Sequence, residues 1–163
     1  MKKKLKKRVK KDKLEEFISE HMCNIVWIAN LDEFSICLIS SDCIDKKNKQ
    51  FGFMADKDKH STACISVKHD YLEATMCYHK KTFADRFKSR NFAFIIQVIC
   101  HEVAHILTGE ALDETKVKYE GIGRVLTERL TERTGRLIYR LYSGWMKTQG
   151  IDISTGKKIK KKK

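Results

Sequence analysis

The sequence predicts an α+β fold in which a small, mostly antiparallel sheet precedes two long helices. Between residues 24 and 68, short apolar segments alternate with polar turn residues, which is typical of strands. From about residue 84 onward, apolar residues instead recur every three or four positions, which is the helical period. A run of strands followed by a run of helices is characteristic of the α+β class.

The charge distribution divides the chain into three parts: a basic, disordered arm at 1–13, a folded body at 14–150, and a basic tail at 151–163. The formal net charge is +13, but residues 14–156 hold 19 basic and 20 acidic side chains. A nucleic-acid-binding fold normally concentrates Lys and Arg on a folded face. We therefore expect no more than weak, nonspecific contact with nucleic acid, made by the lysine-rich ends.

The first half of the body contains the predicted strands. Apolar residues at 14, 17, 18 and 22 indicate a short helix. The apolar segments 24–29 and 34–39 flank a polar turn and so predict a hairpin, and 50–55 is a candidate third strand. Strict alternation over 62–68 predicts a half-buried strand.

The second half is predicted to form two antiparallel helices. The first runs from about Ala84 to Gly109, which is expected to cap it. Asp113 is a suitable N-cap for the second, which continues to Met146. Because the link is short, the helices should form a tight hairpin. The apolar side of the second helix is expected to contain residues 126, 130, 134, 137, 141 and 145.

Features of export are absent from this sequence. No apolar run follows the cationic N-terminus, so a cleaved signal peptide is not expected. The most apolar stretch, 92–107, is interrupted by polar residues and is short for a membrane span. The six cysteines include no C-x-x-C pair and are expected to be reduced. We therefore expect a cytoplasmic protein without membrane contact.

The motif with the clearest chemistry is His101-Glu102-Val103-Ala104-His105, an H-E-x-x-H pattern within the first long helix. Residues four apart on a helix lie on one face, so both imidazoles can bind one Zn²⁺. Glu102 lies about 100° around the helix from His101, beside the metal, where a carboxylate can take a proton from water. These residues predict metal-assisted hydrolysis.

This motif resembles the active-site helix of the zincin metallopeptidases. The resemblance covers about residues 62–146. It implies that His101 and His105 are zinc ligands and that Glu102 is the catalytic base. It also implies that strand 62–68 lies beside the active-site helix, where it would pair with an extended peptide.

The third ligand is expected to be a glutamate, as in the thermolysin-like gluzincins. No histidine follows His105, and Thr108 and Ala111 exclude the metzincin continuation. Three glutamates on the next helix are candidates: Glu120, Glu128 and Glu132. Depth along the predicted hairpin and position around the helix both favour Glu120, and Glu128 is the alternative.

The neighbours of Glu120 agree with the family in one respect and differ in another. Glu120-Gly121-Ile122-Gly123 looks like the glutamate-plus-small-residue pattern of thermolysin's ligand helix. In that family, an aspartate four residues after the ligand holds a zinc histidine, whereas Arg124 occupies that position here. Glu128 and Glu132 are expected to belong to a solvated, salt-bridged face.

The sequence thus predicts a zinc metallopeptidase that cleaves protein or peptide substrates with a zinc-bound water activated by Glu102. One alternative is an inactive zincin-like binding protein of a phage or mobile element, with structural zinc and nucleic-acid-adhering lysine tails. A DNA-binding domain without metal is a third hypothesis. The groups that stabilise the oxyanion remain open among several residues: Tyr119, Tyr139, Tyr142, His69 and His79.

Overall fold

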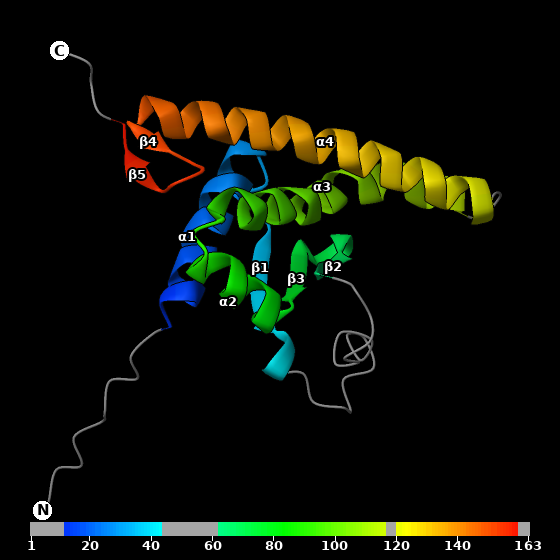
Figure 1. Ribbon diagram of the computed structural model, residues 1–163. Coiled ribbons are helices and arrows are strands. Elements are labelled where there is room, and N and C mark those ends of the chain that lie inside the picture. Colours follow the sequence, from blue (N-terminus) through cyan, green and yellow to red (C-terminus); the bar gives the residue numbers. More distant parts are fainter. Residues whose placement is uncertain (1–11, 44–61, 117–119, 160–163) are drawn as a thin grey trace, which may run out of the picture.

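The computed structural model describes residues 12–43, 62–116 and 120–159, with the backbone alone given for 43, 110–116 and 120–124 (Figure 1). The candidate strand at 50–55 and nearly all of the basic arm lie outside these residues. The main helices are α1 (Lys13–Ile28), α2 (Lys80–Lys88), α3 (Phe92–Lys116) and α4 (Glu120–Thr148). The strands are β1 (Ser35–Ser40), β2 (Ala63–Lys68), β3 (Glu73–Tyr78), β4 (Ile151–Asp152) and β5 (Lys157–Lys158).

The three-stranded sheet is mixed, not mostly antiparallel as predicted. Its strand order is β1-β3-β2; β3 pairs parallel with β1 and antiparallel with β2. The segment that forms β3 was not predicted to be a strand, and its insertion between the other two produces the parallel pairing. The prediction of a strand at 62–68 is confirmed by β2, which is an edge strand in contact with α3.

The predicted strand at 24–29 is wrong, because residues 24–28 form the last part of α1 and Ala29 is its C-cap. Ile25 and Val26 are β-branched, which favours strands, but they continue the three-to-four residue spacing of the buried Ile18 and Met22. Packing of this apolar face overrides the local preference. The helix ends before Asn30, whose φ of 57° lies in the left-handed region.

The predicted boundary between the two long helices is also wrong. Gly109 does not cap α3, which continues through Asp113 to Lys116. A Cβ atom at Gly109 would lie 2.8 Å from Nε2 of His69, so this glycine permits close approach of the η3 turn (His69–Tyr71). A helical glycine can therefore mark a tight contact within a helix as well as its end.

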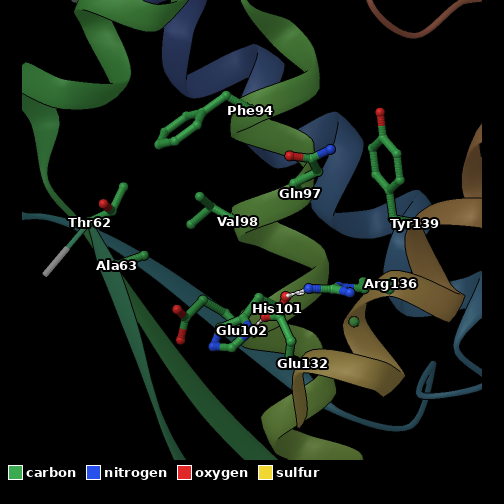
Figure 2. A pocket seen from close by; sticks show the side chains of 11 residues that line it. Thr62, Ala63, Phe94, Gln97, Val98, His101, Glu102, Glu132, Arg136 and Tyr139 are labelled. Carbon is green, nitrogen blue, oxygen red and sulfur yellow. Dashed lines mark hydrogen bonds and ion pairs between the residues drawn. The ribbon is translucent and has the colours of Figure 1, made fainter. Parts of the chain in front are cut away.

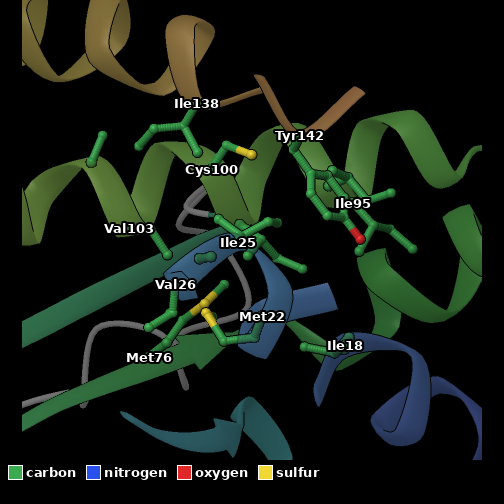
Figure 3. Packing of buried hydrophobic residues seen from close by; sticks show 14 of the residues in the cluster. Ile18, Met22, Ile25, Val26, Met76, Ile95, Cys100, Val103, Ile138 and Tyr142 are labelled. Atoms are coloured by element: carbon green, nitrogen blue, oxygen red, sulfur yellow. The ribbon is translucent and has the colours of Figure 1, made fainter. Parts of the chain in front are cut away.

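The hydrophobic core lies where α1, α3 and α4 meet the inner face of the sheet (Figures 1 and 3). Side chains from all four regions interdigitate there, among them Ile25 of α1, Met76 of β3, Val103 of α3 and Ile138 of α4. The α3 helix lies between the sheet and α4 and contacts both. The H-E-x-x-H motif is consequently carried by the central helix of the fold.

The segment predicted to be a basic tail from residue 151 is partly folded. Strands β4 and β5 form a two-stranded hairpin that packs against the end of α4. Ile153 in its loop is buried. The folded body therefore extends to residue 158 rather than 150.

The sequence predicted reduced cysteines and no membrane contact. Five cysteines are described, and all five are free thiols, as predicted. The stretch Phe92–Gly109 of α3 is long and apolar enough to cross a membrane by length and composition, and half of it is buried inside the fold. That burial is also what the core helix of a folded domain shows.

Candidate metal centre

The α3 helix presents both histidines of the motif on its α4-facing side. The His101 and His105 ring centroids are 4.9 Å apart, and the ring planes are perpendicular. The opposite side of α3 is anchored in the core by Ile99 and Val103, which are fully buried. Helical spacing and core packing together fix the position of the two imidazoles.

The acidic group that completes the cluster is Glu128 of α4. One ligand atom from each of His101, His105 and Glu128 lies within 4.8 Å of the other two. Two imidazole nitrogens and one carboxylate are a donor set that suits Zn²⁺ and leaves a fourth position open. No other group of this kind is found among the described side chains.

Glu120 is the first residue of α4, and its side chain lies outside the described residues. Its backbone is eight residues, or about 12 Å, before Glu128 along the helix. Glu120 was expected to lie level with His105 along the hairpin because α3 was expected to end at Gly109. Since α3 ends at Lys116, His105 lies about 16 Å from that end, a depth closer to that of Glu128.

A second set of side chains on α4 holds the two histidines. Oε2 of Glu132 is 3.5 Å from Nδ1 of His101, and Oε1 of Glu132 accepts hydrogen bonds from Arg136 at 2.7 and 2.9 Å. Oγ1 of Thr131 lies 3.5 Å from Nδ1 of His105. Because each Nδ1 faces a partner on α4, Nε2 is the nitrogen that remains for a metal.

Glu102 differs from the other acids of the site in being buried. It is 5% exposed, and this burial, with a smaller contribution from the charge of Glu128, raises its pKa to about 7. Burial also lowers the pKa of His105. A neutral imidazole is the form that binds metal, so burial of His105 favours its role as a ligand.

A cavity of about 480 Å³ opens beside the motif (Figure 2). His101 and Glu102 lie at one end of it, with Thr62 and Ala63 at the start of β2 on one side and Arg136 of α4 on the other. Phe94 and Val98 of α3 supply its apolar wall. The cavity therefore joins the edge strand to the candidate metal centre.

Glu132 is exposed and pairs with Arg136, which confirms the predicted solvated, salt-bridged face, but its contact with His101 was not predicted. The available signal was its spacing: Glu132 follows Glu128 by four residues, the separation between the ligand glutamate and the histidine-holding aspartate of thermolysin-like enzymes. With Glu128 in the ligand position, the mismatch at Arg124 no longer arises. Among the candidate oxyanion donors, Tyr139 lines the cavity, whereas Tyr142 is buried against His21.

Comparison with known proteins adds no family to this description. No protein-family model matches the chain, and neither the curated proteins nor the solved structures contain a match. The resemblance to zincins therefore depends on the motif and on the side chains gathered around it.

Proposed function

We propose that this protein is a zinc-dependent metallopeptidase whose ligands are His101, His105 and Glu128. The observation that supports the proposal is the approach of three donor atoms from two helices to within 4.8 Å of one another. A cluster of two histidines and a glutamate held by further hydrogen bonds matches a catalytic zinc site better than a structural one, because structural sites use four protein ligands. Zinc in such a site supplies Lewis acidity and lowers the pKa of water.

The role that we assign to Glu102 is that of general base. Burial raises the pKa of Glu102 above that of an ordinary carboxyl, which makes it a better proton acceptor than an exposed glutamate. Glu102 lines the same cavity as His101, so it faces the space that a substrate would occupy. It would take a proton from water during attack on a carbonyl and return it to the leaving amine.

Peptide is the substrate class that we propose, on two grounds. β2 is an edge strand, and its first residues border the cavity at Glu102. An edge strand can hydrogen-bond an extended peptide, which would direct the peptide past the metal ligands. The zincin resemblance suggests the same mode of binding.

The test is to measure zinc content and peptide hydrolysis for the full chain and two variants. Glu102→Gln is expected to keep stoichiometric zinc and to lose hydrolysis of a fluorogenic peptide library, by a factor on the order of 10² to 10⁴. His105→Ala is expected to lose both. Glu16→Gln, an exposed acid on α1, serves as the matched control. Hydrolysis that survives Glu102→Gln would overturn the assignment of Glu102 as the base. A wild-type chain that binds zinc but cleaves nothing would favour the inactive binding protein instead.

A further inference from the structure

The α4 helix is apolar on two separate sides. One face packs against the rest of the fold and includes the buried Ile138 and Tyr142. The other bears four exposed leucines, which we call the leucine row. Its members are Leu126, Leu130, Leu137 and Leu141, at 54, 42, 56 and 53% exposure. The sequence predicted these residues to face the core, so their exposure is the largest departure from expectation in this helix.

The leucine row is continuous along the outer side of the molecule. Spacings of four, seven and four residues keep its side chains within about 60° around the helix, over about 22 Å of its length. Figure 1 shows α4 as the outermost helix, above α3. One turn beyond Leu141, the Trp145 ring lies 6.3 Å from that of Trp27, centroid to centroid, and Trp27 is 61% exposed. A single exposed leucine needs no explanation, but a row of four with an adjacent tryptophan is typical of a binding surface.

The charges beside the row are all of one sign and lie on one side. Arg133 and Arg140 are exposed and lie about 50° to 70° around the helix from the centre of the row, with Arg129 somewhat further on the same side. Among the described side chains of α4, 125–148, the acids are Glu128 and Glu132, which are turned toward His101. No ion pair of Arg133 or Arg140 is found within the described part of the chain.

We propose that the leucine row and its arginines form a docking site for an amphipathic helix with an acidic edge, carried by a partner protein. The apolar face of that helix would cover the leucines, and its carboxylates would pair with Arg133 and Arg140. The exposed arginines on this edge of α4 favour an acidic partner through local charge complementarity.

Two other occupants fit the charges less well. A second copy paired row to row in antiparallel fashion would bring the two Arg133 side chains together. A membrane-surface helix carries cations along its polar face on both sides of the apolar stripe. Here the opposite edge of the row carries Thr127 and Thr134 instead.

The docking site adjoins the candidate metal centre. Arg129 and Arg133 line a hollow together with His101, Glu128 and Glu132. A protein held on the leucine row would therefore have its neighbouring segments beside the ligands. We infer that the docked protein is the substrate; this step rests on the proposed function, whereas the docking itself does not.

The test measures binding without catalysis, using the Glu102→Gln protein and a fluorescein-labelled synthetic helix with a leucine face and a glutamate edge. Its matched control is the same helix with lysine in place of glutamate. We expect the acidic helix to bind at least about tenfold more tightly, and the joint substitution of Leu130→Gln and Leu137→Gln to weaken binding by about tenfold or more. Leu72→Gln, which changes an exposed leucine outside α4, should have no effect.

Joint substitution of Arg133→Glu and Arg140→Glu should reverse the preference toward the lysine-containing helix. Equal binding of both helices, or binding that is unaffected by the leucine substitutions, would overturn the proposal. Sedimentation showing a dimer that dissociates on Leu130→Gln with Leu137→Gln would assign the row to a second copy. Leucine-dependent binding to vesicles containing phosphatidylserine, without helix binding, would assign it to a membrane. If docking is found but the active wild-type chain cleaves nothing, only the proposed function fails.

Discussion

Oε2 of Glu132 lies 3.5 Å from Nδ1 of His101, so an acid on α4 supports a proposed ligand on α3. The same carboxylate accepts two hydrogen bonds from Arg136, which fixes its orientation. A carboxylate on Nδ1 favours the tautomer with a free Nε2 and makes that nitrogen a better metal donor. Glu132 therefore lies where it would position His101 for the proposed metal.

Glu132→Ala is expected to weaken zinc binding about 10- to 100-fold, because His101 loses the group that orients its ring. Competition with a chromogenic chelator measures this affinity directly. Glu132→Asp, which restores a carboxylate on a shorter stem, should recover part of the loss. Glu73→Ala, an exposed acid on β3, is the control. Equal zinc affinity of Glu132→Ala and wild type would show that the contact has no role in metal binding.

The identity of the third ligand can be decided with a second pair of variants. Glu128→Ala is expected to lower zinc affinity by at least about 100-fold, because it removes a ligand from a three-ligand site. Glu120→Ala is expected to leave the affinity within about twofold, because Glu120 begins α4 about 12 Å before Glu128. If Glu120→Ala lowers the zinc affinity and Glu128→Ala does not, then Glu120 is the third ligand, as depth along the predicted hairpin favoured.

The H-E-x-x-H helix and strand β2 could be predicted because each depends on local periodicity alone. The register of α4 against α3 could not be predicted, because it depends on the residue at which α3 ends and the turn begins. Gly109 and Asp113 form a plausible cap pair, yet both lie within α3. That difference of seven residues moves the level of His105 by about 10 Å, which is enough to exchange Glu120 for Glu128.

The side of α4 that packs against the fold could not be predicted from the sequence either, since the helix has two apolar sides. The leucine row is the more hydrophobic, and periodicity favours it as the core side. The face that packs on α3 instead contains Thr131 and Gly135, which allow close approach at the site. Small and hydroxylated residues are weak signals of burial, so the packed face of α4 could not be found this way. Glu128 and Glu132 are exposed, as predicted, and Glu132 pairs with Arg136, but their closeness to His101 depends on the packing of Gly135 and Thr131 against α3.

Gly135 determines how closely α4 approaches the ligand helix. A Cβ atom there would lie 3.0 Å from Cα of His101 and 3.3 Å from the carbonyl oxygen of Cys100. Gly135→Ala is therefore expected to push the helices apart and to reduce the free energy of unfolding by about 1–3 kcal/mol. The zinc affinity should also fall, because separating the helices moves Glu128 of α4 away from His101 of α3.

Gly144→Ala is the matched control for this prediction. A Cβ atom at Gly144 meets nothing within 4 Å, and the residue is an exposed position in the same helix. The substitution is expected to raise the free energy of unfolding by about 0.5–1 kcal/mol through helix propensity. Urea unfolding with and without zinc measures both effects. The same response at both glycines would show that the helices do not approach closely at Gly135.

The last prediction concerns His21, a buried histidine of α1 that is hydrogen-bonded through Nδ1 to the Tyr142 hydroxyl. Burial lowers its pKa from 6.5 to about 4. The unfolded chain therefore binds a proton between pH 6.5 and 4 that the folded chain does not, so the free energy of unfolding falls as the pH falls through this window. The loss should approach about 3 kcal/mol near pH 4.

His21→Gln removes the titrating group, and its stability should fall less steeply than that of the wild type between pH 6.5 and 4. Tyr142→Phe keeps His21 and loses only the hydroxyl, so it should be less stable at each pH but retain the steep dependence. Urea unfolding in the presence of EDTA, from pH 4 to 7.5, keeps metal binding out of the comparison. Parallel stability profiles for wild type and His21→Gln would mean that His21 is protonated as readily in the folded chain as in the unfolded one.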